Sequence, residues 1–171
     1  MAEISRVALF GKLNSVGYKA IESATVFCKL RGNPYVEMVH WLHQVLQLQD
    51  SDLHRIIQHF ALNPSRVAKD FTEALDRLPR GATSISDLSS HVDAAVKEAW
   101  VYATLMFKDT QVRTGHLLVG MLKTPDLRNA LLAISREFDK IKLDELTERF
   151  ADIVATSPET GLRASDGSQM G

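Results

Sequence analysis

Two stretches of the sequence repeat each other, PYVEMVHWLHQVL at residues 34–46 and TQVRTGHLLVGML at residues 110–122. Identical residues recur at one fixed spacing of 76 positions, as His40 and His116 do. The other pairs are Val36 with Val112, Leu42 with Leu118, and Leu46 with Leu122. A fixed offset of this kind is the signature of a duplicated structural unit. The sequence therefore predicts two copies of one small helical module.

The similarity extends on both sides of these stretches and divides the chain. Each unit is expected to carry four helices: a long one, a short one after the Val-x-x-x-His turn, another short one and a closing one. Repeat one covers residues 14–78 and repeat two residues 85–155, and an extra helix at 3–13 precedes them. We expect residues 1–156 to form the domain and the small polar residues 157–171 to be a flexible tail or linker. The predicted fold class is all-α, because no segment alternates with a period of two residues.

Polar residues before apolar runs indicate where the helices begin. Asn14 or Ser15 caps the first long helix, Asn63 followed by Pro64 opens the closing helix of repeat one, and Ser86 with Asp87 opens the second long helix.

Composition limits the classes of function. The 171 residues include 45% hydrophobic residues and carry a formal charge of −1, from 20 basic and 21 acidic residues. This balance favours neither a nucleic-acid nor a membrane-surface partner. One cysteine, Cys28, suits a reducing compartment. No apolar run is long enough to span a bilayer and the start lacks a signal-peptide pattern, so the expected location is the cytosol.

The motifs that could carry chemistry are weak. Glu37 and His40 have the Glu-x-x-His spacing of di-iron helical bundles, but the repeat places Arg113 where the second glutamate belongs. A metal-binding bundle remains a distant alternative. We favour a structural role for His40 and His116 near helix starts, with no metal and no cofactor.

Other catalytic patterns are missing from the sequence as well. The glycines Gly115 and Gly120 are followed by Met121 and Leu122, where a phosphate loop requires Lys and then Ser or Thr. They are interpreted as close-packing positions within a helix. No nucleophile motif is recognisable either, and the chain alone is predicted not to be an enzyme.

Three stretches, RVALFGKLN at 6–14, ATVFCKLRGNPYVE at 24–37 and ALDRLPRGATSISDLS at 74–89, carry a family resemblance. With the doubled four-helix unit, residues 14 to about 155 resemble the N-terminal domain of Clp/Hsp100 AAA+ unfoldases. The extra leading helix is similar to that of the ClpV-type ATPases of bacterial type VI secretion.

The resemblance implies a recognition domain. It would bind a helix of the contracted type VI sheath subunit, for sheath disassembly and recycling in the bacterial cytoplasm. The whole protein would be a hexameric ATPase, assembled through modules that this chain does not contain. The alternative is a general Clp-type N-terminal domain that binds adaptors or unfolded substrates.

The residues around the extra helix suggest where a partner helix binds. Its apolar side chains occupy more sides than one core contact can cover, as expected for one wall of a helix-binding groove. This wall would use Ile4, Val7, Ala8, Leu9, Phe10 and Leu13. The second wall would be the start of the second long helix, with Ile85, Ser86, Leu88 and Val92. The alternative is that all of these side chains belong to the core.

Overall fold

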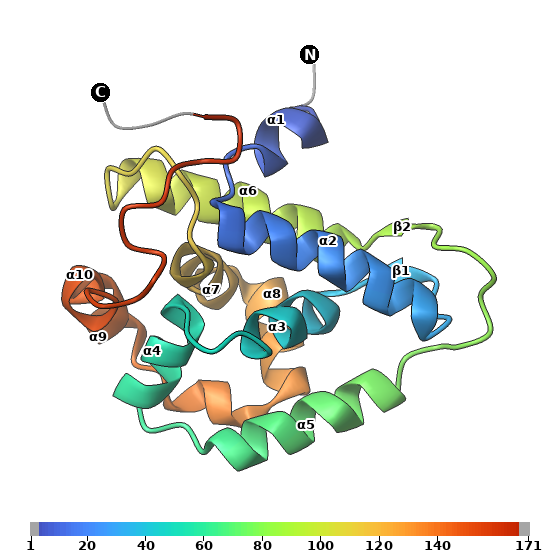
Figure 1. Ribbon diagram of the computed structural model, residues 1–171. Helices are drawn as coiled ribbons and strands as arrows, with labels where there is room; N and C mark the ends of the chain where they lie inside the picture. The colour runs from blue at the N-terminus through green and yellow to red at the C-terminus, as the bar shows by residue number, and fades with distance from the viewer. Residues whose placement is uncertain (1–3, 168–171) are drawn as a thin grey trace.

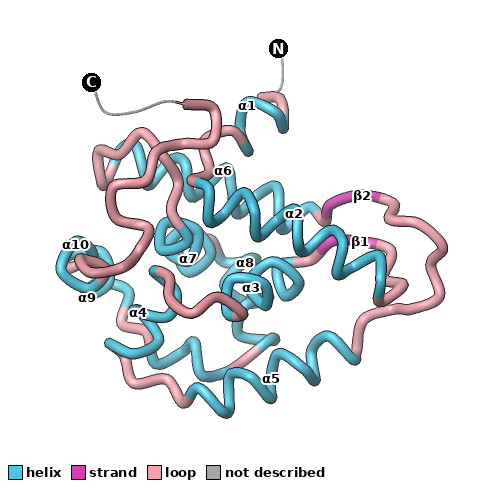
Figure 2. Tube along the Cα trace, in the orientation of Figure 1, coloured by secondary structure: helices cyan, strands magenta, loops and turns pink. Residues whose placement is uncertain are grey.

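The computed structural model describes residues 4–167 and is built almost entirely of helices (Figures 1 and 2). The first half contains α1 Arg6–Phe10, α2 Ser15–Leu30, α3 Met38–Leu46, α4 Asp52–His59 and α5 Pro64–Asp76. The second half contains α6 Ser90–Leu105, α7 Thr114–Lys123, α8 Pro125–Ile134, the 3-10 helix η1 Arg136–Lys140, α9 Leu143–Glu148 and α10 Phe150–Ile153. The strands in this part of the chain are β1 Tyr35–Val36 and β2 Asp87–Leu88. The predicted all-α fold is confirmed.

Two helices begin where the sequence places a capping side chain. Asn14 precedes α2, and its Oδ1 accepts a hydrogen bond from the Gly17 backbone N–H at 2.9 Å. Asn63 precedes α5, and its Oδ1 accepts a hydrogen bond from the Arg66 backbone N–H at 3.1 Å. Pro64 is the first residue of this helix. These side chains satisfy backbone donors that have no partner inside the helix. Of the two caps predicted for α2, the structure selects Asn14.

The second long helix begins later than the sequence predicts. We expected Ser86 and Asp87 to open it, but α6 begins at Ser90 and Ser89 is its capping residue. Asp87 and Leu88 are instead extended, because they pair in parallel with the strand β1. A residue paired in a sheet cannot have helical backbone angles at the same time. Ile85, Ser86 and Leu88 therefore lie on a loop and a strand rather than on a helix.

Equivalent backbone hydrogen bonds join the turn of each repeat to the start of the long helix of the other repeat. The Val36 carbonyl accepts a hydrogen bond at 2.9 Å from the N–H of Ser89, the residue before α6. In the other repeat, the Val112 carbonyl accepts one at 2.9 Å from the N–H of Asn14, the residue before α2. Leu13 forms a parallel bridge with Val112, as Leu88 does with Val36. Each long helix therefore begins against the turn of the other repeat, which joins the repeats into one body.

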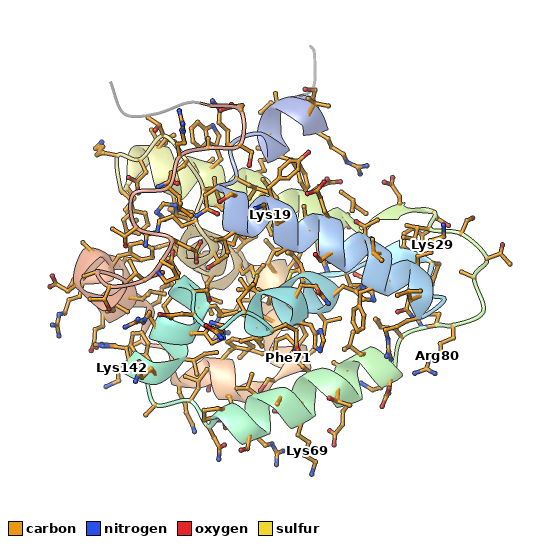
Figure 3. All side chains as sticks on the ribbon, viewed as in Figure 1. Lys19, Lys29, Lys69, Phe71, Arg80 and Lys142 are labelled. Atoms are coloured by element: carbon orange, nitrogen blue, oxygen red, sulfur yellow. The ribbon has the colours of Figure 1, made fainter. Side chains whose placement is uncertain are left out.

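The core lies between the helices of the two repeats. Within each repeat the long helix packs on the helix after the turn, α2 on α3 and α6 on α7. Figure 3 shows Phe71 of α5 pointing inward, where it is 1% exposed, and Lys69 pointing away from the body. Phe71 meets Phe138 of η1 edge to face, with ring centroids 6.1 Å apart. Among residues 4–167, no helix is long and apolar enough to cross a membrane.

The predicted flexible tail or linker covers the end of the described chain. Residue 3 of the predicted first helix and residues 168–171 of the predicted tail lie outside the described residues. Residues 157–167, here named the C-terminal segment, run from the region of α10 across the end of α7 to the base of α1 (Figure 1). Ser157, Glu159 and Ala164 in this segment are buried. Polar contacts with the body hold these residues in the structure, and the flexible tail or linker stays a prediction.

Candidate functional site

Helix α1 divides its side chains between the interior and solvent. Ser5 caps it by accepting a hydrogen bond from the Ala8 backbone N–H at 3.1 Å. Phe10 is buried and stacks on Trp41, with ring centroids 6.4 Å apart. Of the six residues predicted for this wall, three are buried, namely Leu9, Phe10 and Leu13, and three are exposed, namely Ile4, Val7 and Ala8. The exposed three can contact a partner directly.

The side of α1 that faces β2 and α6 is closed by ion pairs. Arg6 donates to the Asp87 carboxylate at 2.6 Å and to both carboxylate oxygens of Asp93 at 2.6 and 2.9 Å. Of the residues predicted for the second wall, Val92 is fully buried, Ile85 and Leu88 are half-buried against the core, and Ser86 is exposed. The backbone N–H of Ser86 donates to the Pro34 carbonyl at 2.7 Å.

A hollow lies on the other side of α1, between α1, α2 and the C-terminal segment. Its volume is ≈ 590 Å³, and it is lined by Val7, Phe10, Gly11, Ser15, Tyr18, Lys19, Glu22, Ser165 and Asp166. Val7 is 87% exposed and Tyr18 is 37% exposed, so both present apolar surface at the hollow. Charged side chains form part of its edge. A hollow lined by both apolar and charged side chains suits the apolar face of a helix.

Sequence reasoning missed Tyr18 and the C-terminal segment as parts of this site. One signal could have indicated Tyr18. It shares a face of α2 with Val26 and Leu30, at intervals of four or eight residues, and these three are 37%, 59% and 81% exposed. An apolar row on the solvent face of a helix marks a surface available for contact. No comparable signal exists for Ser165 and Asp166.

A buried polar cluster holds the C-terminal segment, and we name it the Glu159 cluster. Glu159 is fully buried and accepts hydrogen bonds from the Asn14 side chain at 2.9 Å and the Thr114 backbone N–H at 2.8 Å. It also accepts from the Asp52 backbone N–H at 2.7 Å and from the Thr114 hydroxyl. Arg113 completes the cluster by donating to both carboxylate oxygens of Asp52 at 2.8 Å.

The electrostatics of this cluster follow from its burial. Burial raises the pKa of Glu159, the nearby charge of Asp52 raises it further, and hydrogen bonds from Thr114 and Asn14 act in the opposite direction. Burial lowers the pKa of Arg113, but hydrogen bonds and charge interactions with Asp52 raise it above its usual value. The cluster therefore contains one permanent cation near two carboxyl groups, beside the N-termini of α4 and α7.

His40 and His116 have the structural role predicted for them. Both are fully buried near the start of a helix, α3 or α7. His40 Nδ1 accepts from the Glu37 backbone N–H at 2.8 Å, and His116 Nδ1 accepts from the Arg113 backbone N–H at 3.1 Å. The other ring nitrogen of His40 lies 2.9 Å from Asn33 Oδ1, and that of His116 lies 3.2 Å from a carboxylate oxygen of Asp109. Among residues 4–167, no three His, Cys, Asp or Glu side chains are grouped to hold one.

The two helical glycines are close-packing positions, as predicted. A Cβ atom on Gly120 would lie 2.9 Å from the Ala99 backbone nitrogen, so α6 and α7 touch at this point. A Cβ on Gly115 would lie 2.6 Å from Cζ of Phe150. Both glycines lie inside α7 and not in a loop that could surround a phosphate.

Comparison with known proteins identifies this architecture. The family described as the Clp repeat (R) N-terminal domain matches residues 12–134, which include most of both repeats. The chain belongs to the Clp N-terminal domain family. The match begins after α1, so the helix with the exposed Ile4 and Val7 lies outside the matched residues.

Individual relatives extend the match to the whole chain. The AAA+ ATPase ClpV1 of Pseudomonas aeruginosa is 67% identical over 171 residues, which are 100% of this chain and 19% of that protein. This Clp N-terminal domain therefore spans about a fifth of the length of that relative. One solved structure is 68% identical to this chain. It comes from work on the coevolution of the ATPase ClpV, the TssB-TssC sheath and the accessory HsiE protein in two type VI secretion classes. It superposes with a TM-score of 0.91 and covers 94% of this chain and 99% of that chain.

A more distant structure confirms the fold alone. The complex of a ClpV N-domain with a VipB peptide is 23% identical to this chain and superposes with a TM-score of 0.81. The match covers 94% of this chain and 98% of that chain. The Clp N-terminal fold is thus kept at low sequence identity.

Proposed function

We propose that this chain is the recognition domain of a type VI secretion AAA+ ATPase and binds a helix of a sheath protein. The proposal rests on one observation above others, the solvent-exposed apolar side chains of α1 beside a hollow, on a chain 67% identical to ClpV1. The peptide bound to the related ClpV N-domain supports the kind of ligand. The domain itself performs no chemistry, and its activity is selective binding.

The sheath helix lies on the α2 side of α1 in this proposal. Val7 and Tyr18 would contact its apolar face, and Ile4 and Ala8 would extend the contact along α1. The α6 side, which the sequence favoured, is occupied by the ion pairs of Arg6 with Asp87 and Asp93. A helix that bound there would have to displace them.

A titration with a synthetic sheath-subunit helix tests both sides of α1. Val7→Ser and Tyr18→Ala should each cost about 1–3 kcal/mol of binding free energy, which raises Kd about five- to 150-fold. Val101→Ser is the matched control, because Val101 is 39% exposed on α6 and does not line the hollow. Because Val7 and Val101 are exposed, these two changes should leave the melting temperature close to that of the parent.

The remaining outcomes distinguish the alternatives. If Ile85→Ala with Leu88→Ala weakens binding and Val7→Ser does not, the groove lies on the α6 side, as the sequence predicted. If no variant of α1 weakens binding, the front helix is not the site. If unstructured model substrates compete as well as the helix does, the chain is a general Clp N-terminal domain. Phe10→Ala is a poor probe, because Phe10 is buried against Trp41 and its truncation would lower stability.

The proposal also predicts that the purified chain does not hydrolyse ATP. None of the described residues forms a phosphate-binding loop, since Gly115 and Gly120 are used for packing. Phosphate release by the pure chain above that of a buffer control would contradict this part of the proposal.

A further inference from the structure

The base of α1 is paired with the C-terminal segment. The backbone N–H of Ser165 donates to the Leu13 carbonyl at 2.7 Å, and that of Asp166 donates to the Gly11 carbonyl at 2.9 Å. Asn14 and Ala164 form an antiparallel bridge beside them. On the opposite edge, the same short stretch pairs with the turn of repeat two. Residues 11–14 are therefore held between two neighbours, one of which is the C-terminal segment.

The other end of the C-terminal segment is fixed by the Glu159 cluster. Asn14 connects the two ends, because its Oδ1 caps α2 and its Nδ2 donates to Glu159 at 2.9 Å. The start of α2, the base of α1 and the C-terminal segment therefore meet at one side chain. A change in the position of Glu159 acts directly on the residues that position α1.

Between these anchors the C-terminal segment has few buried apolar contacts, although the Thr160 hydroxyl accepts a hydrogen bond from Arg113 at 3.0 Å and donates one to the Val154 carbonyl at 3.0 Å. Thr160, Gly161 and Arg163 are exposed, and Ala164 supplies its buried apolar contact with the body. Segments with few buried apolar contacts open locally at a free energy far below that of global unfolding. The segment can therefore leave the body while the two repeats stay folded.

The hollow beside α1 depends on this segment. Ser165 and Asp166 line one side of it, and Val7 and Phe10 line another. A helix bound there touches both α1 and the segment. When the segment opens, the hollow loses one of its walls.

We propose that the C-terminal segment is a latch, and that its docking and the binding of a ligand in the hollow stabilise each other. This inference rests on the function proposed above and adds a means of regulation to that site. Coupling of this kind is reciprocal. A bound helix holds the latch closed, and weakening the Glu159 cluster lowers affinity for the helix although no residue of the cluster lines the hollow. Through the latch, ligand binding and any constraint on the far end of the segment can affect each other.

Thr114→Val tests the latch with a small change. It removes the hydroxyl that donates to Glu159 and keeps the size of the side chain. Amide hydrogen exchange in residues 160–167 should become about tenfold faster, because a buried hydrogen bond to Glu159 is lost. Affinity for the sheath helix should fall about three- to tenfold. Addition of the helix to the parent should slow exchange in the same residues.

Thr124→Val is the matched control. It removes a hydroxyl at the other end of α7, where Thr124 donates to the Gly120 carbonyl at 2.8 Å, and should change neither exchange in the segment nor affinity. Glu159→Gln is a second, stronger variant that should shift both readouts further than Thr114→Val does.

The outcomes separate the latch from the site. If the parent binds the helix and Thr114→Val binds it equally well despite faster exchange, the latch is refuted and the site stands. Unchanged exchange in residues 160–167, in the variants or on addition of the helix, refutes the latch as well. If the parent does not bind the helix at all, the proposed function fails and the latch fails with it.

Discussion

The turns before α3 and α7 have the same backbone contacts but different side chains. In each, the valine carbonyl accepts a hydrogen bond from the residue that precedes the long helix of the other repeat, and the histidine accepts from the turn. Between valine and histidine, repeat one has Glu37, which is half-buried, and repeat two has Arg113, which is buried against Asp52. The contacts that both repeats share maintain the fold, and the residue that differs connects repeat two to the C-terminal segment.

A duplicated fold can change at positions where its backbone contacts do not depend on the side chain. The Val and His positions are fixed by backbone geometry that both halves need. Position 37 is half-buried and its equivalent 113 is buried, but the side chains at these positions can differ without changing the shared backbone contacts. In repeat two the difference produced a cluster that has no counterpart in repeat one within the described residues, and the proposed binding site lies on the side of the molecule where that cluster is.

The largest expected effect is on the buried ion pair. Arg113→Met should lower the free energy of unfolding by about 3–5 kcal/mol, because it leaves the Asp52 carboxylate buried without its cation. Glu37→Met, the equivalent change in repeat one, should cost less than about 1 kcal/mol, because Glu37 is only half-buried. Urea denaturation of both variants measures the difference.

A double variant checks the reason for that loss. Asp52→Asn combined with Arg113→Met should recover part of the stability, since the unpaired charge is then gone. Equal costs for Arg113→Met and Glu37→Met would mean that the two turns do not differ energetically.

The next largest effect concerns His40. Burial, with the positive charges of Arg31 and His43, lowers its pKa from 6.5 to about 4. The unfolded chain binds this proton near pH 6.5, and the folded chain binds it only near pH 4. Stability from this group is therefore complete above pH 6.5 and decreases as the pH falls towards 4, by up to about 3 kcal/mol.

Denaturation of the parent and of His40→Asn at pH 7, 5.5 and 4.5 isolates this contribution. The difference between the two proteins should shrink as the pH falls, because the variant has no imidazole to protonate. The raised pKa of Glu159 changes stability in the opposite direction, since the folded chain then binds the proton more tightly, but it is common to both proteins and cancels in the comparison. A difference that does not depend on pH would show that folding does not lower the pKa of His40.

Local pattern predicts most of the fold. The repeated Val and His residues, the caps Asn14 and Asn63, and the all-α class are visible in the sequence because each depends on neighbours within a few positions. The start of α6 was misplaced because Asp87 pairs with Tyr35, 52 positions earlier in the chain. Strand pairing of two residues leaves no periodic signal.

The candidate site was less predictable, because its contacts also join residues that are far apart in the sequence. The sequence indicates that α1 has too many apolar faces, but not which of them the body covers. Glu159 lies in a polar stretch typical of a flexible tail, and its partners Asn14 and Asp52 are more than 100 positions away. Arg113 was interpreted only as a residue that interrupts a metal motif, because nothing local reveals its pairing with Asp52, 61 positions away.

A third prediction compares equivalent positions on α7 and α3. Gly120→Ala should cost about 1–3 kcal/mol, because the added Cβ meets the backbone of Ala99 and neither helix can yield without moving the other. The gain in helix propensity from replacing glycine offsets about 1 kcal/mol at most. Gln44, the equivalent residue of repeat one, is half-buried, and Gln44→Ala should change stability little. A tolerated Gly120→Ala would mean that the α6 and α7 contact is no tighter than that of α2 and α3.

The smallest expected effect concerns the ion pairs that join α1 to repeat two. Arg6 is 46% exposed, and its pairs with Asp87 and Asp93 are open to solvent, so salt weakens them. Arg6→Gln should lower the melting temperature by no more than about 3 °C at low salt, and the difference from the parent should vanish in about 0.5 M NaCl. Arg80→Gln, which removes another exposed pair, with Asp76, is the matched control and should behave alike. A loss much larger than that of the control would mean that charge, and not the burial of Leu9 and Phe10, holds α1 on the body. Helix α1 would then detach in high salt, and binding to the sheath helix would fall with it.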